Sequence, residues 1–261
     1  MDYNPYYIAR IAGICHHTAF RLSARLHKNP VFAILHTMTY SQKKIAALFD
    51  LDGVIFDTEK QYTVFWAAVM RKYKGDDSPA QKIKGSTLER IYAEWFPGME
   101  KERQEITSAL GVFERNMKLD YIPGLTDFVH DLKSHGVQCA IVTSSNKIKM
   151  EIVYPQHPEL KNLFDRILTA EMFERSKPAP DPYLLGAAVF DIPPEDCFVF
   201  EDSFNGLKSG RAAGMHVIGL STTNAPEIIR KYADMVIPDF TGMTYERLTA
   251  DLSRRPKTTW A

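Results

Sequence analysis

Two aspartates, Asp50 and Asp52, stand one residue apart in the segment FDLDGVIFDTE, directly after the apolar run IAALF. In an extended strand alternate side chains share a face, so both carboxylates would point the same way and repel each other. A carboxylate can act as a nucleophile, and a second one nearby can act as a general acid and base. The pair therefore indicates a site where a cation and an anionic group lie between the two side chains.

Further acids, hydroxyls and a lysine stand where other β-rich runs end. Thr143 and Ser144 follow the run VQCAIV, and Glu201 and Asp202 follow the run DCFVF. Lys177 lies in the loop SKPAPDPY. Each alone has an ordinary explanation as a turn, a helix N-cap or a solvated lysine. Those explanations do not account for complementary charges at separate strand ends. Because ligands of parallel sheets bind at the carboxyl ends of the strands, we expect these side chains on one rim.

Phosphoryl transfer through an aspartyl-phosphate is the chemistry that uses this set of residues. A carboxylate can approach an anionic phosphate only where charge is neutralised, which predicts a hard cation with oxygen ligands, hence Mg²⁺. Lys177 would neutralise phosphoryl oxygens, and the Thr143 hydroxyl would donate to them. A Ca²⁺-binding loop fails on spacing, because the sixth position from Asp50 is Ile55 rather than Gly and the twelfth is Gln61 rather than Glu.

The elements that must position these residues are short β-rich runs that alternate with helical patterns from Ile45 onward. The runs are KIAALFD, VQCAIVTS, DRILTA, DCFVFED and MHVIGL. This alternation predicts an α/β fold with a Rossmann-like parallel sheet core and helices on both faces. Between DLDGVIFD and YIPGL, roughly 60 residues have helical periodicity and no strand, which indicates an inserted α-helical cap domain.

These patterns divide the chain into four parts. The expected parts are an N-terminal extension at 1–43, an α/β phosphotransfer core at 44–58 and 122–240, a helical cap at 59–121, and a C-terminal helix and tail at 241–261. We expect the cap to open and close over the rim, with hinges near 57–59 and 121–124.

Composition narrows the class of protein. The 261-residue chain is 45% hydrophobic, enough for a buried core, and no run approaches the roughly 18 apolar residues of a membrane span. Residues 1–49 hold six Lys or Arg against one acid, and the remainder holds 26 basic and 31 acidic residues, so no nucleic-acid surface is indicated. The three cysteines lack C-x-x-C spacing, which favours reduced thiols and a cytoplasmic location. We expect a monomer that binds neither nucleic acid nor membrane.

The first 40 residues carry Arg, Ser and His with almost no acid, a composition that overlaps with transit peptides. The apolar region and the small-residue cleavage site of a secretory signal are not evident. We favour an extension outside the functional domain, with Met38 as an alternative start and a targeting role as the second interpretation.

Four motifs in order, DLDGVIFDTE, VTSSN, the lysine of SKPAPDPY and FEDSFNG, resemble those of the haloacid dehalogenase superfamily. More narrowly, residues 44–240 are similar to the β-phosphoglucomutase and phosphatase branch with a helical cap. The resemblance implies that Asp50 is the nucleophile and Asp52 the general acid and base. It also implies that Mg²⁺ is held by the Asp50 carboxylate, the Asp52 main-chain carbonyl and Asp202, with Glu201 as a further ligand or a neighbour of the ligands.

The resemblance also implies the contacts to the substrate. The residues that would hold the phosphoryl group are Thr143, Ser144 and Lys177. In such relatives a cap loop around a Lys-Gly pair faces the substrate; the matching residues in IKGST are Lys84, Gly85 and Ser86, and Asn146 would border the same pocket. A helix start before TLERIYAEWF is the alternative explanation of that loop.

Two departures from the branch bear on the reaction. Phosphoglucomutases of this branch carry a cap histidine and an arginine in the specificity loop, whereas the matching positions here are Tyr62 and Leu88, with Arg90 close by. Leucine cannot bind the second phosphate of a bisphosphate through charge and hydrogen bonds as arginine does. We therefore predict a Mg²⁺-dependent phosphatase that acts on a small phosphorylated metabolite, a sugar phosphate or similar. The alternatives are a β-phosphoglucomutase-like phosphotransferase and a non-catalytic phosphometabolite-binding protein.

Overall fold

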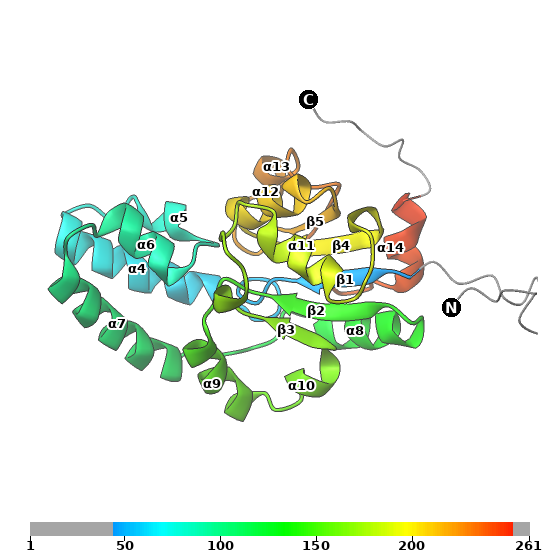
Figure 1. Ribbon diagram of the computed structural model, residues 1–261, viewed down its shortest axis with the longest axis horizontal. Helices are drawn as coiled ribbons and strands as arrows, with labels where there is room; N and C mark the ends of the chain where they lie inside the picture. The colour runs from blue at the N-terminus through cyan, green and yellow to red at the C-terminus, as the bar shows by residue number, and fades with distance from the viewer. Residues whose placement is uncertain (1–43, 253–261) are drawn as a thin grey trace, which may run out of the picture. The chain divides into compact units, whose positions relative to one another are not determined.

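A computed structural model describes residues 44–252, in which six strands form one parallel sheet (Figure 1). The strands are β1 (Ala46–Phe49), β2 (Gln138–Val142), β3 (Arg166–Leu168), β4 (Cys197–Glu201), β5 (His216–Leu220) and β6 (Met235–Ile237). Their order across the sheet is β3-β2-β1-β4-β5-β6. The predicted parallel α/β fold is confirmed. The sequence pattern indicated five strands, and the structure has a sixth, β6. It was not predicted because it is a three-residue edge strand without a long apolar run.

Side chains of the central strands alternate between two hydrophobic cores, as the two-residue period of a strand requires. Ala47 and Phe49 pack into one core, and Ala46 and Leu48 pack into the other. The helices that contribute to the first core are α8 (Leu125–Ser134), α9 (Lys147–Gln156), α10 (Leu160–Leu163) and α14 (Tyr245–Leu252). Those that contribute to the second are α11 (Asp181–Ala188), α12 (Phe204–Ala212) and α13 (Pro226–Ile229). Short 3₁₀ turns, Ala170–Met172 and Pro194–Asp196, precede α11 and β4.

Four helices between β1 and β2 enclose a third hydrophobic core. They are α4 (Glu59–Lys74), α5 (Ala80–Ile83), α6 (Leu88–Trp95) and α7 (Glu100–Arg115). Their buried side chains include Trp66, Met70, Ile91, Phe96 and Ile106. In Figure 1 these helices lie beyond the carboxyl ends of the strands. The inserted helical cap predicted from the sequence is therefore present, and we use "cap" for α4 to α7 and their loops.

The chain enters and leaves the cap at adjacent points. The Asp57 N–H donates to the Asp120 carbonyl at 2.9 Å, and Phe56 and Tyr121 form an isolated antiparallel bridge with stacked rings. Hinge movement at these two connections stays a prediction, as do the residue numbers given above for the boundaries between parts. The predicted extension at 1–43 lies outside the described residues. Within 44–252, no helix combines the length and the hydropathy that crossing a bilayer would need.

Candidate active site

The carboxyl ends of β1 and β4 lie side by side in the middle of the sheet, where the strand order changes direction. Asp50 directly follows β1, Glu201 ends β4, and Asp202 follows it. The Asp50 N–H donates to the Phe200 carbonyl at 3.0 Å, which extends the β1–β4 pairing to the first catalytic candidate. The sheet topology thus brings the Asp50 carboxylate next to the consecutive acids Glu201 and Asp202, which are about 150 residues away in the sequence.

These three carboxylates form a buried cluster suited to a divalent cation. Oxygens of Asp50, Glu201 and Asp202 lie within 4.8 Å of one another, and the residues are only 6%, 0% and 1% exposed. Among the described residues, the buried Oδ1 atom of Asp202 has no hydrogen-bond partner. Like charges at this separation repel unless a cation lies among them, and oxygen-rich sites favour hard cations such as Mg²⁺. The donor set therefore fits a magnesium ion.

The ammonium group of Lys177 compensates part of the negative charge of this cluster. Its side chain is fully buried, and its ammonium group donates to Asp50 Oδ1 at 2.8 Å, to Glu201 Oε1 at 2.7 Å and to the Val142 carbonyl at 3.0 Å. Burial alone would lower the pKa of Lys177, but the Asp50 and Glu201 carboxylates outweigh burial and raise it. The lysine therefore stays charged, and all three of its N–H donors are used.

Glu201 is held by five hydrogen bonds. Oε1 accepts from Lys177 and from the Tyr183 hydroxyl at 2.9 Å, while Oε2 accepts from the Asp202 N–H, the Ser203 N–H and the Ser203 hydroxyl, each at 3.1 Å. A Cβ atom at Gly206 would overlap this carboxylate, so α12 can start here only with glycine at that position. Both oxygens of Glu201 are thus committed to fixing the lysine and the β4–α12 turn.

Burial also governs the protonation of the neighbouring acids. It raises the pKa of Asp50 to about 7, where Lys177 opposes the rise and Glu201 adds to it. Burial likewise raises the pKa of Asp202 well above its usual range, and repulsion from Glu59 and Glu201 adds to that effect. A bound divalent cation would reverse this tendency by favouring the ionised carboxylates.

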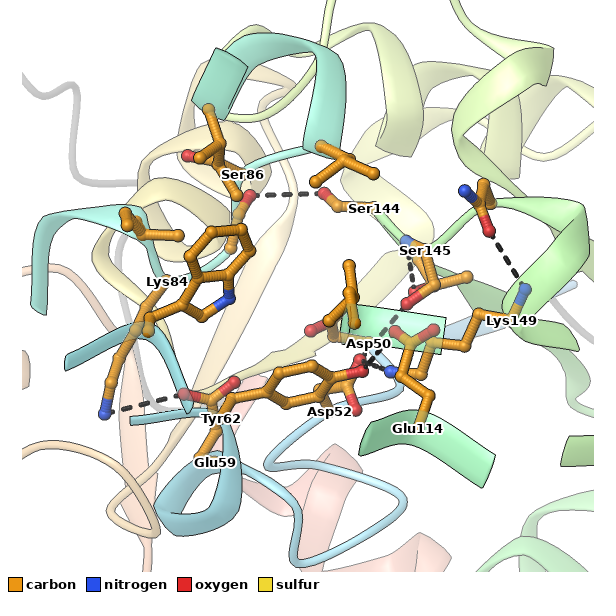
Figure 2. A pocket seen from close by; sticks show the side chains of 18 of the residues that line it. Asp50, Asp52, Glu59, Tyr62, Lys84, Ser86, Glu114, Ser144, Ser145 and Lys149 are labelled. Atoms are coloured by element: carbon orange, nitrogen blue, oxygen red, sulfur yellow. Dashed lines mark hydrogen bonds and ion pairs between the residues drawn. The ribbon is translucent and has the colours of Figure 1, made fainter. Parts of the chain in front are cut away.

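Asp52 lies in a separate network of hydrogen bonds (Figure 2). The Thr58 hydroxyl donates to Asp52 Oδ1 at 2.6 Å, and the Ser145 hydroxyl donates to Oδ2 at 3.2 Å. The ammonium group of Lys149, a buried residue in the first turn of α9, forms an ion pair with Oδ2. Asn146 begins α9 by accepting the Lys149 N–H at 2.9 Å, which sets the direction of that first turn. The carboxylate of Asp52 is therefore oriented by contacts from three segments.

The predicted phosphoryl-binding residues lie on the same rim. Thr143 is buried and lines the pocket together with Ser144 and Asn146. The Thr143 hydroxyl accepts the Ser145 N–H at 3.0 Å, whereas the Ser144 hydroxyl donates to the Gly85 carbonyl at 3.2 Å. The end of β2 thus presents two hydroxyl groups, of which one is hydrogen-bonded within the core and the other to the cap loop.

The cap loop at 84–86 contacts the start of α12. Asn205 donates to the Lys84 carbonyl at 2.9 Å and to the Ser86 hydroxyl at 3.2 Å, and Gly85 has φ 71°. The helix start proposed as the alternative is also present, but it follows the loop, because Thr87 accepts the Arg90 N–H at 3.3 Å. The loop faces the pocket, and α6 begins directly after it.

Cap and core together enclose a pocket of about 110 Å³. Its lining includes Asp50, Asp52, Asp202, Thr143, Ser144, Asn146, Lys84, Gly85 and Ser86. Tyr62 and Leu88, which occupy the two departing positions, line it as well. Arg90 instead donates to the Lys177 carbonyl at 2.6 Å and lies 3.8 Å from the Glu94 carboxylate.

Several pocket residues were not predicted from the sequence. Ser145 and Lys149 contact Asp52. Ser145 is part of the motif VTSSN, and Lys149 lies in the helical turn that Asn146 caps, so the motif is a signal that could have pointed to both. Glu59 and Glu114 line the pocket from the cap. Glu114 has no signal in the sequence, because the face that α7 turns to the pocket depends on how the cap packs.

Comparisons with known proteins agree with this geometry. The family model described as haloacid dehalogenase-like hydrolase matches residues 47–220. A probable pseudouridine-5'-phosphatase of Saccharomyces cerevisiae is 31% identical over 217 residues, covering 74% of this chain and 89% of the relative. The fructose-1-phosphate phosphatase YqaB of Escherichia coli is 30% identical over 183 residues, covering 66% and 93%. A hydrolase of family IA, variant 3, from Entamoeba histolytica has a similar structure, with TM-score 0.68, 22% identity and coverage of 80% and 99%.

Proposed function

The chain belongs to the haloacid dehalogenase-like hydrolases, and on this premise we propose a Mg²⁺-dependent phosphatase that hydrolyses a small phosphorylated metabolite through an aspartyl-phosphate on Asp50. The observation that carries the proposal is the position of Asp50 at the switch point of the sheet. Lys177 and Asp202 flank its carboxylate, and Asp52 stands two residues away in its own network. The relatives named above are phosphatases, which supports a phosphoric monoester hydrolase.

In the first step, an oxygen of the Asp50 carboxylate forms a bond to phosphorus as the bond from phosphorus to the ester oxygen breaks. Asp52 donates a proton to that leaving oxygen, so the leaving group departs as an alcohol. In the second step, Asp52 takes a proton from water, and the water oxygen forms a bond to phosphorus. The bond from phosphorus to Asp50 breaks, which releases phosphate, returns Asp50 to a carboxylate and leaves Asp52 protonated for the next cycle.

The residues proposed to hold Mg²⁺ are Asp50, through its carboxylate, Asp52, through its main-chain carbonyl, and Asp202. When bound, the ion supplies the positive charge that lets two anions approach each other. The buried Oδ1 of Asp202, which lacks a hydrogen bond within the described residues, supports this assignment. Because both oxygens of Glu201 are already hydrogen-bonded, we assign Glu201 to positioning Lys177 rather than to binding the metal.

The proposed phosphoryl contacts are Thr143, Ser144 and Lys177. Lys177 contributes a fixed charge beneath Asp50, while the hydroxyls at the end of β2 can donate to phosphoryl oxygens. Lys84, Gly85 and Ser86 of the cap and Asn146 of the core are proposed to border the substrate. Such closed surroundings remove bulk water from around the reacting groups, which strengthens the electrostatic interactions between them.

The substrate is proposed to carry one phosphate, as a sugar phosphate or a similar ester does. The name of the Escherichia coli relative states a sugar with one phosphate, fructose 1-phosphate. Leu88 rather than an arginine lines the pocket, and Arg90 is bound to the Lys177 carbonyl, so the second phosphate of a mutase intermediate lacks a guanidinium partner among these residues. A monomeric state and a cytoplasmic location stay predictions.

The Asp50→Asn variant tests the proposal. Phosphate release from p-nitrophenyl phosphate and from a panel of sugar phosphates, with Mg²⁺, should fall by about 10³-fold or more. Asp127→Asn, at an exposed position on α8, is the control and should keep normal activity. Retained turnover in Asp50→Asn would exclude the aspartyl-phosphate, and turnover that requires added glucose 1,6-bisphosphate would favour a mutase.

A further inference from the structure

Three pocket residues beside Asp52 have no role in the chemistry proposed above. Tyr62 comes from α4 and Glu114 from α7, both in the cap, whereas Lys149 comes from α9 in the core. Figure 2 shows their side chains gathered next to Asp52, at the side of the pocket away from the loop at 84–86. Since Asp52 is the group that meets the ester oxygen, its neighbours are the residues that face the leaving group.

Specific contacts hold these three side chains together. The Tyr62 hydroxyl donates to Glu114 Oε1 at 2.8 Å. The Lys149 ammonium group pairs with Asp52 and lies 4.6 Å from the centre of the Tyr62 ring. Glu114 is 9% exposed and Lys149 is 3% exposed. Two charged side chains are thus fixed and largely removed from water before any substrate binds.

Both charged groups keep hydrogen-bonding capacity. An ammonium group has three donors, and the structure shows one of them used by Lys149, toward Asp52. A carboxylate accepts several hydrogen bonds, and the structure shows Glu114 accepting one, from Tyr62. Donors and acceptors therefore stand next to each other, which matches a hydroxyl group, because a hydroxyl both donates and accepts.

The charges at this end of the pocket disfavour a second anion. Among the described lining residues, the two lysines are already paired: Lys149 with Asp52, and Lys84 with Glu59 at 3.5 Å. The charges of Asp52, Glu114 and Lys149 sum to one negative charge, so a carboxylate or a second phosphate on the leaving group would be repelled. Burial raises the pKa of Glu114, and the charge of Lys149 and the hydrogen bond from Tyr62 oppose that rise.

Apolar side chains complete this part of the lining. Trp66 and Leu110, both from the cap, line the same pocket and can cover the C–H surface of a short carbon chain or a ring. A leaving group with hydroxyls on one side and C–H groups on the other would satisfy all of these neighbours.

We propose that Glu114 and Lys149 form a leaving-group subsite that selects phosphate esters of uncharged, hydroxylated leaving groups over esters whose leaving group lacks hydroxyls or carries a second anion. This inference rests on the proposed function, because it assigns the ester oxygen to Asp52. The discrimination against a leaving group without hydroxyls arises because that group would cover the remaining donors of Lys149 and the remaining acceptors of Glu114 without pairing them.

Three-carbon esters of matched size test the subsite with the full chain and Mg²⁺. The probes are glycerol 1-phosphate, propyl phosphate, which lacks both hydroxyls, and 3-phosphoglycerate, which carries a carboxylate. We expect kcat/KM for glycerol 1-phosphate to exceed that of each other ester by at least about tenfold. Equal values for the three esters would overturn the subsite.

Two variants separate the two charged residues. In Lys149→Met the ratio of kcat/KM between glycerol 1-phosphate and propyl phosphate should fall toward one, because the donor to the hydroxyl is lost. In Glu114→Gln the ratio between glycerol 1-phosphate and 3-phosphoglycerate should fall at least about fivefold, because the repelling charge is removed. Glu105→Gln, the same change at an exposed position of α7, should leave both ratios unchanged. General damage to the fold would lower all rates together, so ratios that stay at the wild-type value in both variants would overturn the proposal.

A fourth ester distinguishes failure of the subsite from failure of the proposed function. Hydrolysis of p-nitrophenyl phosphate that depends on Asp50, combined with equal kcat/KM for the three-carbon esters, would overturn only the subsite. Absence of hydrolysis with all four esters would overturn both.

Discussion

At the scale of single residues, Lys177 is a buried cation that pairs with two buried carboxylates. Its three N–H donors are all used, and two of them neutralise the buried carboxylates of Asp50 and Glu201. Removing one partner of a buried ion pair leaves an uncompensated charge, which costs far more than the net stabilisation that the pair provides. The same residue is therefore needed for the phosphoryl site and for the stability of the β1–β4 rim.

Lys177→Met should lose both properties. We expect phosphatase activity to fall by about 10²-fold or more, and the free energy of unfolding in urea without Mg²⁺ to fall by about 3–5 kcal/mol. Lys101→Met, at an exposed position of α7, is the matched control and should change that free energy by less than about 0.5 kcal/mol. A Lys177→Met protein as stable as the control would show that the two carboxylates are compensated in another way.

At the scale of elements, the contact between the cap loop and the start of α12 defines the closed pocket. Gly85 is placed so that an added Cβ atom would overlap the Ser203 hydroxyl, and Asn205 bonds to the residues on either side of it. Ser203 also begins α12 by accepting the Gly206 N–H at 3.1 Å. The cap thus docks on a turn that is fixed by the same residues that hold the acidic cluster.

Gly85→Ala should weaken this docking. A side chain at residue 85 would push the loop away from Ser203, so we expect KM for the substrate to rise by about tenfold while the melting temperature changes by only a few degrees. Gly75→Ala is the matched control, because Gly75 also has positive φ, 74°, but no atom lies near its missing Cβ. A KM that rises equally in the two variants would show that backbone strain, and not loop docking, is the cause, and an unchanged KM in Gly85→Ala would contradict the prediction.

The parts of the site that could be predicted from the sequence are those that sheet topology determines. In a parallel sheet, residues at strand ends meet on one rim, and this rule correctly brought Asp50, Lys177 and Asp202 together. Glu114 and Lys149 could not be predicted in the same way, because helix periodicity gives the faces of a helix but not the neighbour that each face meets. The short edge strand β6 was missed for a related reason, since three residues carry too little pattern.

At the scale of the whole molecule, the position of the acidic cluster would couple the proposed metal binding to folding. Asp50 and Asp202, two of the proposed ligands, converge only when β1 and β4 pair, so the unfolded chain does not offer the same site. A ligand that binds the folded state alone stabilises it in proportion to the logarithm of its concentration. Mg²⁺ should therefore act on the thermal stability of the protein as well as on its chemistry.

Added Mg²⁺ should raise the melting temperature. At about 100 times its dissociation constant it contributes about 2.7 kcal/mol, which corresponds to about 5–10 °C for a chain of this size. Differential scanning fluorimetry with Mg²⁺ or EDTA, at constant ionic strength, measures the shift. In Asp202→Asn we expect most of the shift to disappear, while the melting temperature in EDTA does not fall, because one repelling charge is gone. An equal shift in both proteins would place the ion elsewhere.

The adjacent entry and exit of the cap have a consequence for how such a protein can change over evolutionary time. Since Asp57 and Asp120 are hydrogen-bonded neighbours, any segment whose ends fit that gap can be exchanged without altering the register of the sheet. Asp50 and the residues proposed to bind the cation would be inherited intact with the core. Of the residues that face the leaving group, Tyr62 and Glu114 would be replaced with the segment, while Lys149 would stay. New substrate ranges could therefore arise by exchange of the cap segment. Lys149, which stays with the core, would then be the residue at which substitutions adapt the core to the new cap.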